Sequence, residues 1–528
     1  NIQVKPGNFY LCNLTQDSQI RLSGSVVEYL DSTILTVTLT ELQRAQAIKL
    51  SATDGGDGSA IVLDIFADAF RDMATNLNPS ILNRQVHEIA DTIDPEIVNV
   101  TIDYNDGKLI GHMSETIDLM VASKINRNKL FLANQSEEES VSLFASEVFL
   151  EEFALTFTLI LTETSRVEGI KRSGTMGGDG GPLYLYAKSG AVVDIAQNEQ
   201  VKTSGIIIYE TEDTTSPTFV SCSLNYGIGS LVIVASETID ATPADLVLLG
   251  NIYLSQTGGS NDLQLHGAKV IAIDALRITI ILSETQRVAA LVKSGTPGGD
   301  NSSLVLDIYH GALQDIAMKK MQTIRNNSIT EIRDSIIPSI LNASLDYNNG
   351  FLVIRASETL KLLDSTPYFV ASTVLTKYFA LEQINLRNFA GADGSQSVNL
   401  AGLPFNSTDG ILITVFLSES KRVNALIRSG TDGGDGVPLI LDVDEKSVED
   451  MGKNKNVANL GLFVQEIEDS TPPEFSSGVI DFTTGILMLE ASETLKLEDQ
   501  TNVHLGKLNL VNRSGDINGL TQKYQLRN

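Results

Sequence analysis

Acidic residues recur along the chain in short motifs that could supply ligands to a cation. An E-x-x-D-[TS] motif ends the last expected strand of four repeats, and an S-E-T glutamate follows each of these four glutamates after 27 residues. The aspartate of a D-[MI]-[AG] motif lies 16 residues before the same glutamate. Carboxylate oxygens are the hard ligands that Ca²⁺ prefers, so three or four carboxylates are predicted to meet at a calcium site at each domain joint. The candidate ligands are Asp72, Glu88, Asp91, Glu115, Asp194, Glu210, Asp213, Glu237, Asp315, Glu331, Asp334, Glu358, Asp450, Glu466, Asp469 and Glu493.

A second interpretation of these motifs needs no metal. The S-E-T hydroxyl and carboxylate would then bind backbone amides at a strand end, and the E-x-x-D side chains would be solvated. If calcium does bind with a Kd of about 10⁻⁴ to 10⁻³ M, as in extracellular modules, roughly millimolar calcium adds about 0.4 to 1.4 kcal/mol per site. Calcium would then stiffen the joints more than it would fold the domains.

A glycine-rich stretch, RSGTMGGDG at 172–180, returns with little change at 50–58, 293–301 and 428–436. A phosphate-binding loop would need a helix after its glycines and a suitably placed lysine, whereas a strand follows here. Calcium β-roll loops repeat a glycine-rich nonapeptide, but successive G-G-D aspartates here are 122, 121 and 135 residues apart. We interpret the stretch as a tight turn whose glycines supply positive φ and whose aspartate binds local amides.

The constant spacing of the motifs indicates tandem repeats of about 120 residues. Each repeat after the first begins at a proline in a Thr/Ser-rich joint, and proline restricts the preceding residue to extended conformations. The prolines are Pro95, Pro217, Pro338 and Pro472. The predicted domains are a partial repeat at 1–92 without opening strands, full repeats at 93–214, 215–335 and 336–470, and a partial repeat at 471–528 without closing strands. The repeat at 336–470 carries a longer loop at about 361–409.

Within a repeat the pattern predicts an immunoglobulin-like β-sandwich of about seven short strands. The stretch from Ile97 to Thr116 alternates apolar and polar residues and turns at Asp106 and Gly107, as in a β-hairpin. Val167 and Ile170 are spaced as on one helical turn. We therefore expect an all-β chain of tandem immunoglobulin-like repeats in an extended rod.

Composition restricts the partners and the chemistry. The formal net charge of −28 would repel nucleic acid and anionic lipid. The sequence contains no run of about 18 apolar residues, the length needed to cross a membrane. Cys12 and Cys222 stand at different repeat positions and are expected to be buried thiols. The five histidines share no repeat position, and no serine or cysteine has a base partner at motif level. The protein is not expected to be an enzyme.

N-glycosylation sequons are a further group of candidate sites, and several recur at equivalent repeat positions, which suggests glycans kept clear of packing. Inheritance of the repeat sequence would produce the same recurrence. The candidate residues are Asn13, Asn99, Asn134, Asn301, Asn326, Asn342, Asn406 and Asn512.

Two motifs carry a resemblance to known proteins. ASETID at 235–240 and VVDIAQN at 192–198 resemble the "FSE" and "D-x-A-G-N" signatures of bacterial-type immunoglobulin-like repeats. Similar cadherin-like repeats occur in large surface proteins of algae and protists, including flagellar hairs (mastigonemes). The chain departs from the pattern because the glycine is usually missing and Lys319 replaces the asparagine. The resemblance implies an extracellular or cell-surface location and an adhesive or structural role.

Two functions follow as hypotheses. One is a structural repeat region of a large extracellular protein that builds a cell-surface filament or matrix. The other is an adhesin that binds a specific surface or carbohydrate ligand, for which the loop at 361–409 is the candidate. The expected partners are neighbouring copies or further repeats of the same protein, with candidate glycans. We also expect sequence beyond both ends, or strands lent between subunits, to complete the partial repeats.

Overall fold

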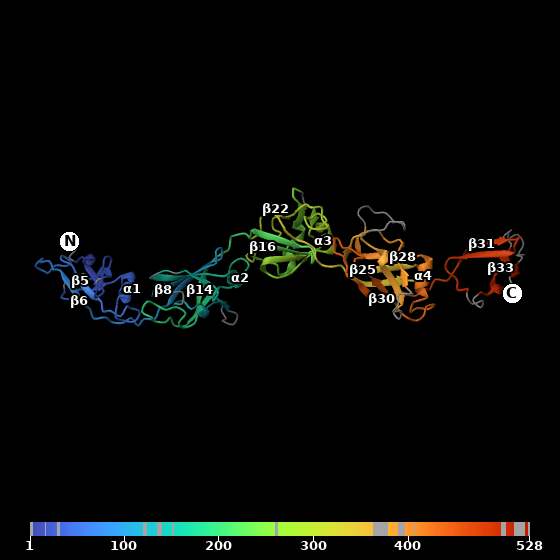
Figure 1. Cartoon of the computed structure of the whole chain (residues 1–528). Coiled ribbons are helices and arrows are strands. Elements are labelled where there is room, and N and C mark those ends of the chain that lie inside the picture. Colours follow the sequence, from blue (N-terminus) through green and yellow to red (C-terminus); the bar gives the residue numbers. More distant parts are fainter. Residues whose placement is uncertain are drawn as a thin grey trace. The chain divides into compact units, whose positions relative to one another are not determined.

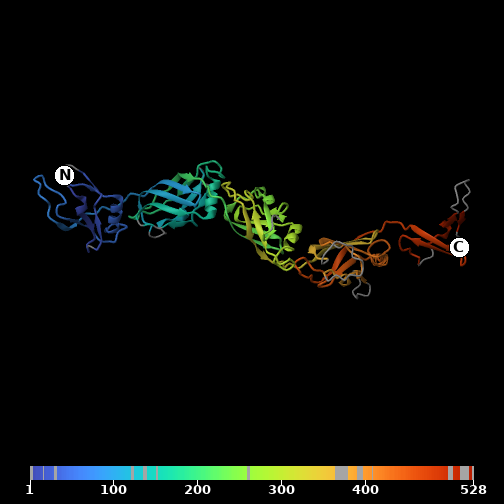
Figure 2. The same ribbon diagram turned by 90° about the horizontal axis from the view of Figure 1, so that it is seen from above.

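The computed structural model of the protein describes residues 4–15, 17–28, 32–119, 124–134, 140–149, 151, 153–258, 262–362, 378–388, 397–406, 408–497, 503–511 and 523–525. Figures 1 and 2 show β-sheet along the whole chain, with short isolated helices between sheets. By compactness the chain divides into two units. One comprises Asn1–Ser223, Leu231–Ile281 and Val305–Thr330, and the other comprises Leu224–Ser230, Leu282–Leu304 and Glu331–Asn528.

The repeat at 93–214 shows how the elements are connected. Its strands follow the order β10-β9-β13-β14-β7-β8-β12-β11. Strand β14 joins two sheets, because it pairs antiparallel with β13 and parallel with β7. The elements are β7 (Ile97–Asp103), β8 (Lys108–Ile117), η3 (Arg127–Lys129), β9 (Leu130–Ala133), β10 (Val141–Ser142), β11 (Glu147–Phe149), β12 (Ala154–Ile160), α2 (Glu163–Lys171), β13 (Tyr184–Ala187) and β14 (Thr203–Thr211).

Alternate residues of neighbouring strands contribute to the core of this repeat. Val100 and Ile102 of β7, Leu109 of β8, and Phe157 and Leu159 of β12 are at most 1% exposed. Successive side chains of a strand point to opposite faces, so the apolar positions of each strand collect on one side. These residues belong to one buried cluster.

The other repeats reuse this plan. Residues 1–92 contain η1 (Pro6–Asn8), β1 (Phe9–Cys12), β2 (Gln19–Arg21), β3 (Val26–Val27), β4 (Val37–Thr38), α1 (Glu41–Lys49), β5 (Val62–Ile65) and β6 (Ile81–Gln85). Residues 215–335 contain β15 (Phe219–Asn225), β16 (Ser230–Ile239), η5 (Ala244–Leu246), η6 (Leu249–Asn251), β17 (Ile252–Gln256), β18 (Leu263–Gln264), β19 (Lys269–Val270), β20 (Ala275–Ile281), α3 (Glu284–Leu291), β21 (Leu304–Ile308), β22 (Ile324–Ser328) and β23 (Thr330–Ile332).

The last two stretches follow in the same order. Residues 336–470 contain β24 (Ile340–Asp346), β25 (Phe351–Leu360), η7 (Leu381–Gln383), β26 (Ile384–Asn388), β27 (Ser397–Asn399), β28 (Gly410–Phe416), α4 (Glu419–Leu426), β29 (Leu439–Val443) and β30 (Asn459–Ile467). Residues 471–528 contain β31 (Phe475–Asp481), β32 (Ile486–Ala491), η9 (Leu505–Lys507), β33 (Asn509–Val511) and β34 (Lys523–Gln525).

The predicted fold class is confirmed: the chain is mainly β-sheet, in immunoglobulin-like repeats. The predicted hairpin is β7 with β8, and its turn uses Gly107 at φ +68°. The predicted helical turn around Val167 is α2. The domain boundaries and the rod stay predictions. Much of the candidate binding loop, residues 363–377, 389–396 and 407, lies outside the described residues.

Candidate functional site

The candidate site is built on the first turn of the short helix in each repeat. In α2 the helix begins after Thr162, whose side chain accepts a hydrogen bond from the Ser165 amide. Glu163 and Arg166 stand three residues apart and so share one face of the helix. The Nε and Nη2 atoms of Arg166 donate to the two carboxylate oxygens of Glu163 at 2.8 and 2.9 Å. This paired contact fixes the plane of the guanidinium.

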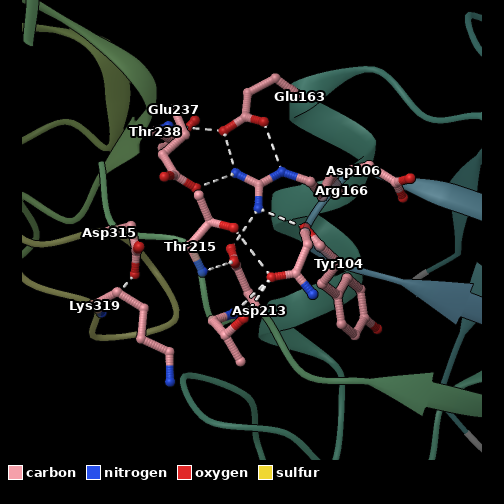
Figure 3. Close-up of polar contacts among 12 residues, drawn as sticks. Tyr104, Asp106, Glu163, Arg166, Asp213, Thr215, Glu237, Thr238, Asp315 and Lys319 are labelled. Atoms are coloured by element: carbon pink, nitrogen blue, oxygen red, sulfur yellow. Dashed lines mark hydrogen bonds and ion pairs between the residues drawn. The ribbon is translucent and has the colours of Figure 1, made fainter. Parts of the chain in front are cut away.

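The same guanidinium reaches two further carboxylates (Figure 3). Nη1 of Arg166 donates to Asp213 at 2.7 Å and to the Tyr104 carbonyl at 3.0 Å, and Nη2 donates to Glu237 at 3.0 Å. Asp213 follows the last strand of the repeat, whereas Glu237 belongs to β16 of the following repeat. The arginine therefore ties a helix, the connecting segment and the next repeat together.

The joint is buried and is held by a backbone contact as well. The side chains of Arg166, Asp213 and Glu237 are 8%, 1% and 9% exposed. Glu163 also accepts a hydrogen bond from the Thr238 amide at 2.7 Å. Burial alone would raise the pKa of Glu163, but hydrogen bonds from Arg166 and Thr238 hold it below its usual value.

The same contacts recur at the other joints, where each arginine binds the glutamate three residues before it, an E-x-x-D aspartate and an S-E-T glutamate. The sets are Arg44 with Glu41, Asp91 and Glu115; Arg287 with Glu284, Asp334 and Glu358; and Arg422 with Glu419, Asp469 and Glu493. Arg287 and Arg422 are 5% and 8% exposed, but Arg44 is 33% exposed. Arg44 is thus the most exposed of the four arginines.

The G-G-D turn forms a second contact at the joint, and here the interpretation as a tight turn is confirmed. Gly177 has φ +89°, and the Asp179 carboxylate accepts a hydrogen bond from the Gly181 amide at 2.8 Å. A Cβ atom on Gly177 would lie 2.0 Å from the carbonyl oxygen of Ile316 in the following repeat. The turn therefore needs glycine for its backbone conformation and for its approach to the next repeat.

At each of the first three joints, a further carboxylate lies close to two of the carboxylates that bind the arginine. Oxygens of Asp91, Glu115 and Asp194 lie within 4.8 Å of one another, as do those of Asp213, Glu237 and Asp315, and those of Asp334, Glu358 and Asp450. The D-[MI]-[AG] aspartate in each group comes from the repeat that follows the joint. The predicted grouping took this aspartate from the repeat before the joint, so that part of the prediction is corrected.

Burial changes the titration of these groups. Burial, with Arg166 opposing it, raises the pKa of Glu237 to about 7. Burial and the neighbouring Asp450 raise the pKa of Glu358 to about 8. Burial also raises the pKa of Glu115, Asp315 and Asp450 to about 6 each. Ionising all carboxylates of a cluster is therefore costly in this environment.

The glutamates of the E-x-x-D motif lie away from the clusters. Glu210 accepts hydrogen bonds from the buried Tyr104 hydroxyl at 2.7 Å and from the Gly174 amide at 3.2 Å. Glu331 and Glu466 make the same two contacts in their repeats, and Glu88 accepts from the amides of Ala52 and Ile61. These glutamates fasten the glycine-rich turn to the rest of their own repeat.

Two other predictions can be located in the structure. Asp72 is exposed and binds Asn76 rather than a cluster. The interpretation without metal is right about the S-E-T serine, because the Ser236 hydroxyl accepts a hydrogen bond from the Thr218 amide. The S-E-T glutamate differs from that interpretation, since it binds an arginine.

The sequon asparagines occupy different environments. Asn301, Asn326 and Asn342 are exposed, whereas Asn13, Asn99, Asn134 and Asn406 are half-buried. The Asn134 amide donates to Asp179 at 2.6 Å. Asn512 lies outside the described residues.

The arginines were missed by the sequence analysis. A signal was present, because Arg44, Arg166, Arg287 and Arg422 recur with the spacing of the G-G-D aspartates. Each stands three residues after the glutamate of an L-[TS]-E motif, which is the spacing of an ion pair on a helix. A repeat search restricted to acidic residues does not detect their counter-charges.

Comparisons with known proteins give only weak similarities. No protein-family model matches the chain, and no curated protein matches it. The N-terminal part of the bacterial S-layer protein SbsC is 11% identical over 36% of this chain and 44% of its own length, with a TM-score of 0.17. The chicken CNTN1 FN1–FN3 domains are 8% identical over 70% and 97%, with a TM-score of 0.19. The S-layer protein rSbsC(31–844) is 9% identical over 82% and 63%, with a TM-score of 0.17.

This chain thus spans less than half of the SbsC N-terminal fragment. Structures similar to it include fibronectin-like and S-layer protein domains, and TM-scores this low transfer no function to it. Among the described residues, no helix is long and apolar enough to cross a membrane.

Proposed function

We propose that this chain is a structural repeat region of a large extracellular protein that builds a cell-surface filament or matrix. The observation that supports this role is the reuse of one arginine–carboxylate contact at successive joints. An enzyme or a receptor places distinctive residues at one location, whereas here the same residues return in every repeat. In tandem repeats the interfaces between neighbours add directly to the stability of the array.

The connecting segment is fastened rather than free. Asn105 in the hairpin turn accepts hydrogen bonds from the Thr214 amide and the Thr215 hydroxyl, and the Asp213 carboxylate accepts one from the Thr215 amide. Asn348 binds the connecting segment that follows Asp469 in the same way, through Ser470 and Thr471. A segment held at these points transmits tension to the sheets instead of extending as a flexible linker.

The partners follow from the same geometry. The joint uses surfaces present in every complete repeat, so the natural neighbours are further repeats of the same protein or other copies of it. The exposed sequons Asn301, Asn326 and Asn342 provide attachment points for glycans in an extracellular protein.

Immunogold electron microscopy of the source cells with antibodies against the whole chain tests this proposal. We expect label along surface filaments or throughout a continuous surface coat. Antibodies preabsorbed with the chain provide the control. Label inside the cells, or at isolated contact points as for an adhesin, would overturn the proposal.

A further inference from the structure

Carboxylates outnumber cations in the joint clusters. At the second joint Glu163, Asp213, Glu237 and Asp315 accompany a single guanidinium, that of Arg166. Asp213, Glu237 and Asp315 are buried. Buried charge without a counter-charge is costly, so the cluster favours an additional positive species.

Several carboxylate oxygens in the clusters have no hydrogen-bond partner. Oε1 of Glu115, Oε1 of Glu358 and Oδ2 of Asp315 are buried and unpaired in the part of the chain that the structure describes. Their residues are 7%, 6% and 1% exposed. An unpaired oxygen on a buried carboxylate is rare in folded proteins, and each of these residues belongs to a different cluster.

The orientation of these side chains is fixed by their second oxygen. Oε2 of Glu358 accepts from Arg287 at 3.1 Å, and Oδ1 of Asp315 accepts from the Lys319 amide at 2.8 Å. Figure 3 shows the Asp315 carboxylate with one oxygen bound to Lys319 and the other on the side of Glu237. Each of these cluster residues thus keeps one carboxylate oxygen available to a cation.

The donor set identifies the class of ligand. Each cluster offers only carboxylate oxygens, and these lie within 4.8 Å of one another. Calcium binds oxygen at about 2.3–2.6 Å, so two oxygens on one ion lie up to about 5 Å apart. Magnesium is less suitable because it demands a near-octahedral shell, and soft metals prefer sulfur and nitrogen.

We propose that the first three joints each bind one Ca²⁺ between the S-E-T glutamate, the E-x-x-D aspartate and the D-[MI]-[AG] aspartate of the following repeat. The arginine keeps one oxygen of the glutamate, and the ion takes the second. The E-x-x-D aspartate accepts hydrogen bonds on both oxygens, from the arginine and from a backbone amide, so it would bind the ion through a remaining lone pair. This inference rests on the proposed role of the joints as fasteners, to which it adds a ligand.

The alternative counter-charge is a proton shared between the glutamate and the aspartate. The raised pKa of Glu358, caused by burial and by Asp450, is compatible with either species. Bound calcium and a shared proton predict different results: if the counter-charge is a proton, added calcium should not change the stability of the joint at constant pH. A calcium titration therefore distinguishes them.

The second joint should bind the ion most tightly. Asp194 and Asp450 each accept a hydrogen bond on Oδ2 from an asparagine side chain, at 2.9 Å in both cases. Asp315 has Lys319 at that position, and the Lys319 ammonium binds Glu212 instead, at 2.7 Å. Oδ2 of Asp315 is thus free to bind a cation without first losing a hydrogen bond.

Isothermal titration of the chelator-treated full chain with CaCl₂ at constant pH tests the proposal. We expect saturable binding by three clusters and a melting temperature that rises with calcium. The variant carrying Glu115→Gln, Glu237→Gln and Glu358→Gln should bind no calcium at these sites and lose the rise. Glutamine keeps an oxygen for the arginine and places an amide against the aspartate, so the joints should stay closed.

Glu445→Gln is the matched control, because Glu445 is 69% exposed and lies outside the clusters. It should bind calcium as the unchanged chain does. Glu237→Gln alone should remove the tightest site, with unchanged circular dichroism as the check on folding. Binding that the triple variant retains, or a chain whose melting temperature ignores calcium, would overturn the proposal. Either result leaves the immunogold test of the structural role intact.

Discussion

Replacing the buried arginine of the second joint tests how strongly successive repeats are fastened. Arg166→Met keeps the length of the side chain but leaves Asp213 and Glu237 buried without their cation. Removing one partner of a buried ion pair costs about 3–5 kcal/mol. The matched variant Arg44→Met alters the same network at a joint where the arginine is 33% exposed. There the ion pairs are partly screened at the arginine, and the Asp91 side chain is 12% exposed against 1% for Asp213, so the expected cost is smaller, about 1 kcal/mol.

Native-state hydrogen exchange of the full chain, followed by mass spectrometry of peptides, measures the stability of each joint separately. The Thr238 amide donates to Glu163 at the second joint, and the Thr116 amide donates to Glu41 at the first. Each 1.4 kcal/mol corresponds to a factor of ten. Exchange at Thr238 should therefore accelerate by at least about 100-fold in Arg166→Met, and exchange at Thr116 by roughly fivefold in Arg44→Met.

The amide of Thr359, at the third joint, provides an internal control and should keep its rate in both variants. Adding Asp213→Asn to Arg166→Met should slow exchange again, because one buried uncompensated charge is removed. Equal accelerations in the two single variants, or an unchanged rate at Thr238 in a folded Arg166→Met chain, would refute the argument from burial.

Three further predictions concern other features. Gly177→Ala should open the second joint and accelerate amide exchange around Ile316 by about tenfold or more, since overpacking costs about 1–3 kcal/mol. Gly433 has a similar positive φ, but a Cβ atom there would meet Leu426 at 3.9 Å, an ordinary contact. Gly433→Ala should therefore leave amide exchange around it unchanged. Burial raises the pKa of Cys222 to about 12 and that of Cys12 to about 11. An aromatic disulfide reagent at about pH 8 should therefore label both thiols only after unfolding. Fast labelling of the native chain would contradict their burial. Glycopeptide mass spectrometry of the native protein should find glycans at Asn326 and Asn342 in preference to Asn134, and the reverse occupancy would contradict the argument from exposure.

The elements with a local signal were predictable from the sequence. The β7–β8 hairpin follows from alternating apolar and polar residues around an Asp-Gly turn, and the helix around Val167 follows from its apolar spacing. The glycine turn was identified because its aspartate and its amide are neighbours in the chain. Each of these features depends on residues within one element.

The membership of the cluster was predictable only in part, because neighbours in sequence lie at opposite ends of a strand. Asp194 and Asp213 are separated by β14, whose nine residues extend for about 30 Å at about 3.3 Å each. Asp194 therefore lies at the joint with the preceding repeat and Asp213 at the joint with the following one. A count of residues between motifs carries no information about this direction.

The approach of Gly177 to the Ile316 carbonyl joins main chain to main chain. The carbonyl facing the equivalent glycine belongs to Ile195 at the first joint and to Met451 at the third, so the identity of that residue does not matter to the fit. Any repeat with the same backbone path can therefore form the same contact with its neighbour. The protein can gain or lose whole repeats by duplication or deletion, and its reach can evolve, without inventing a new interface each time.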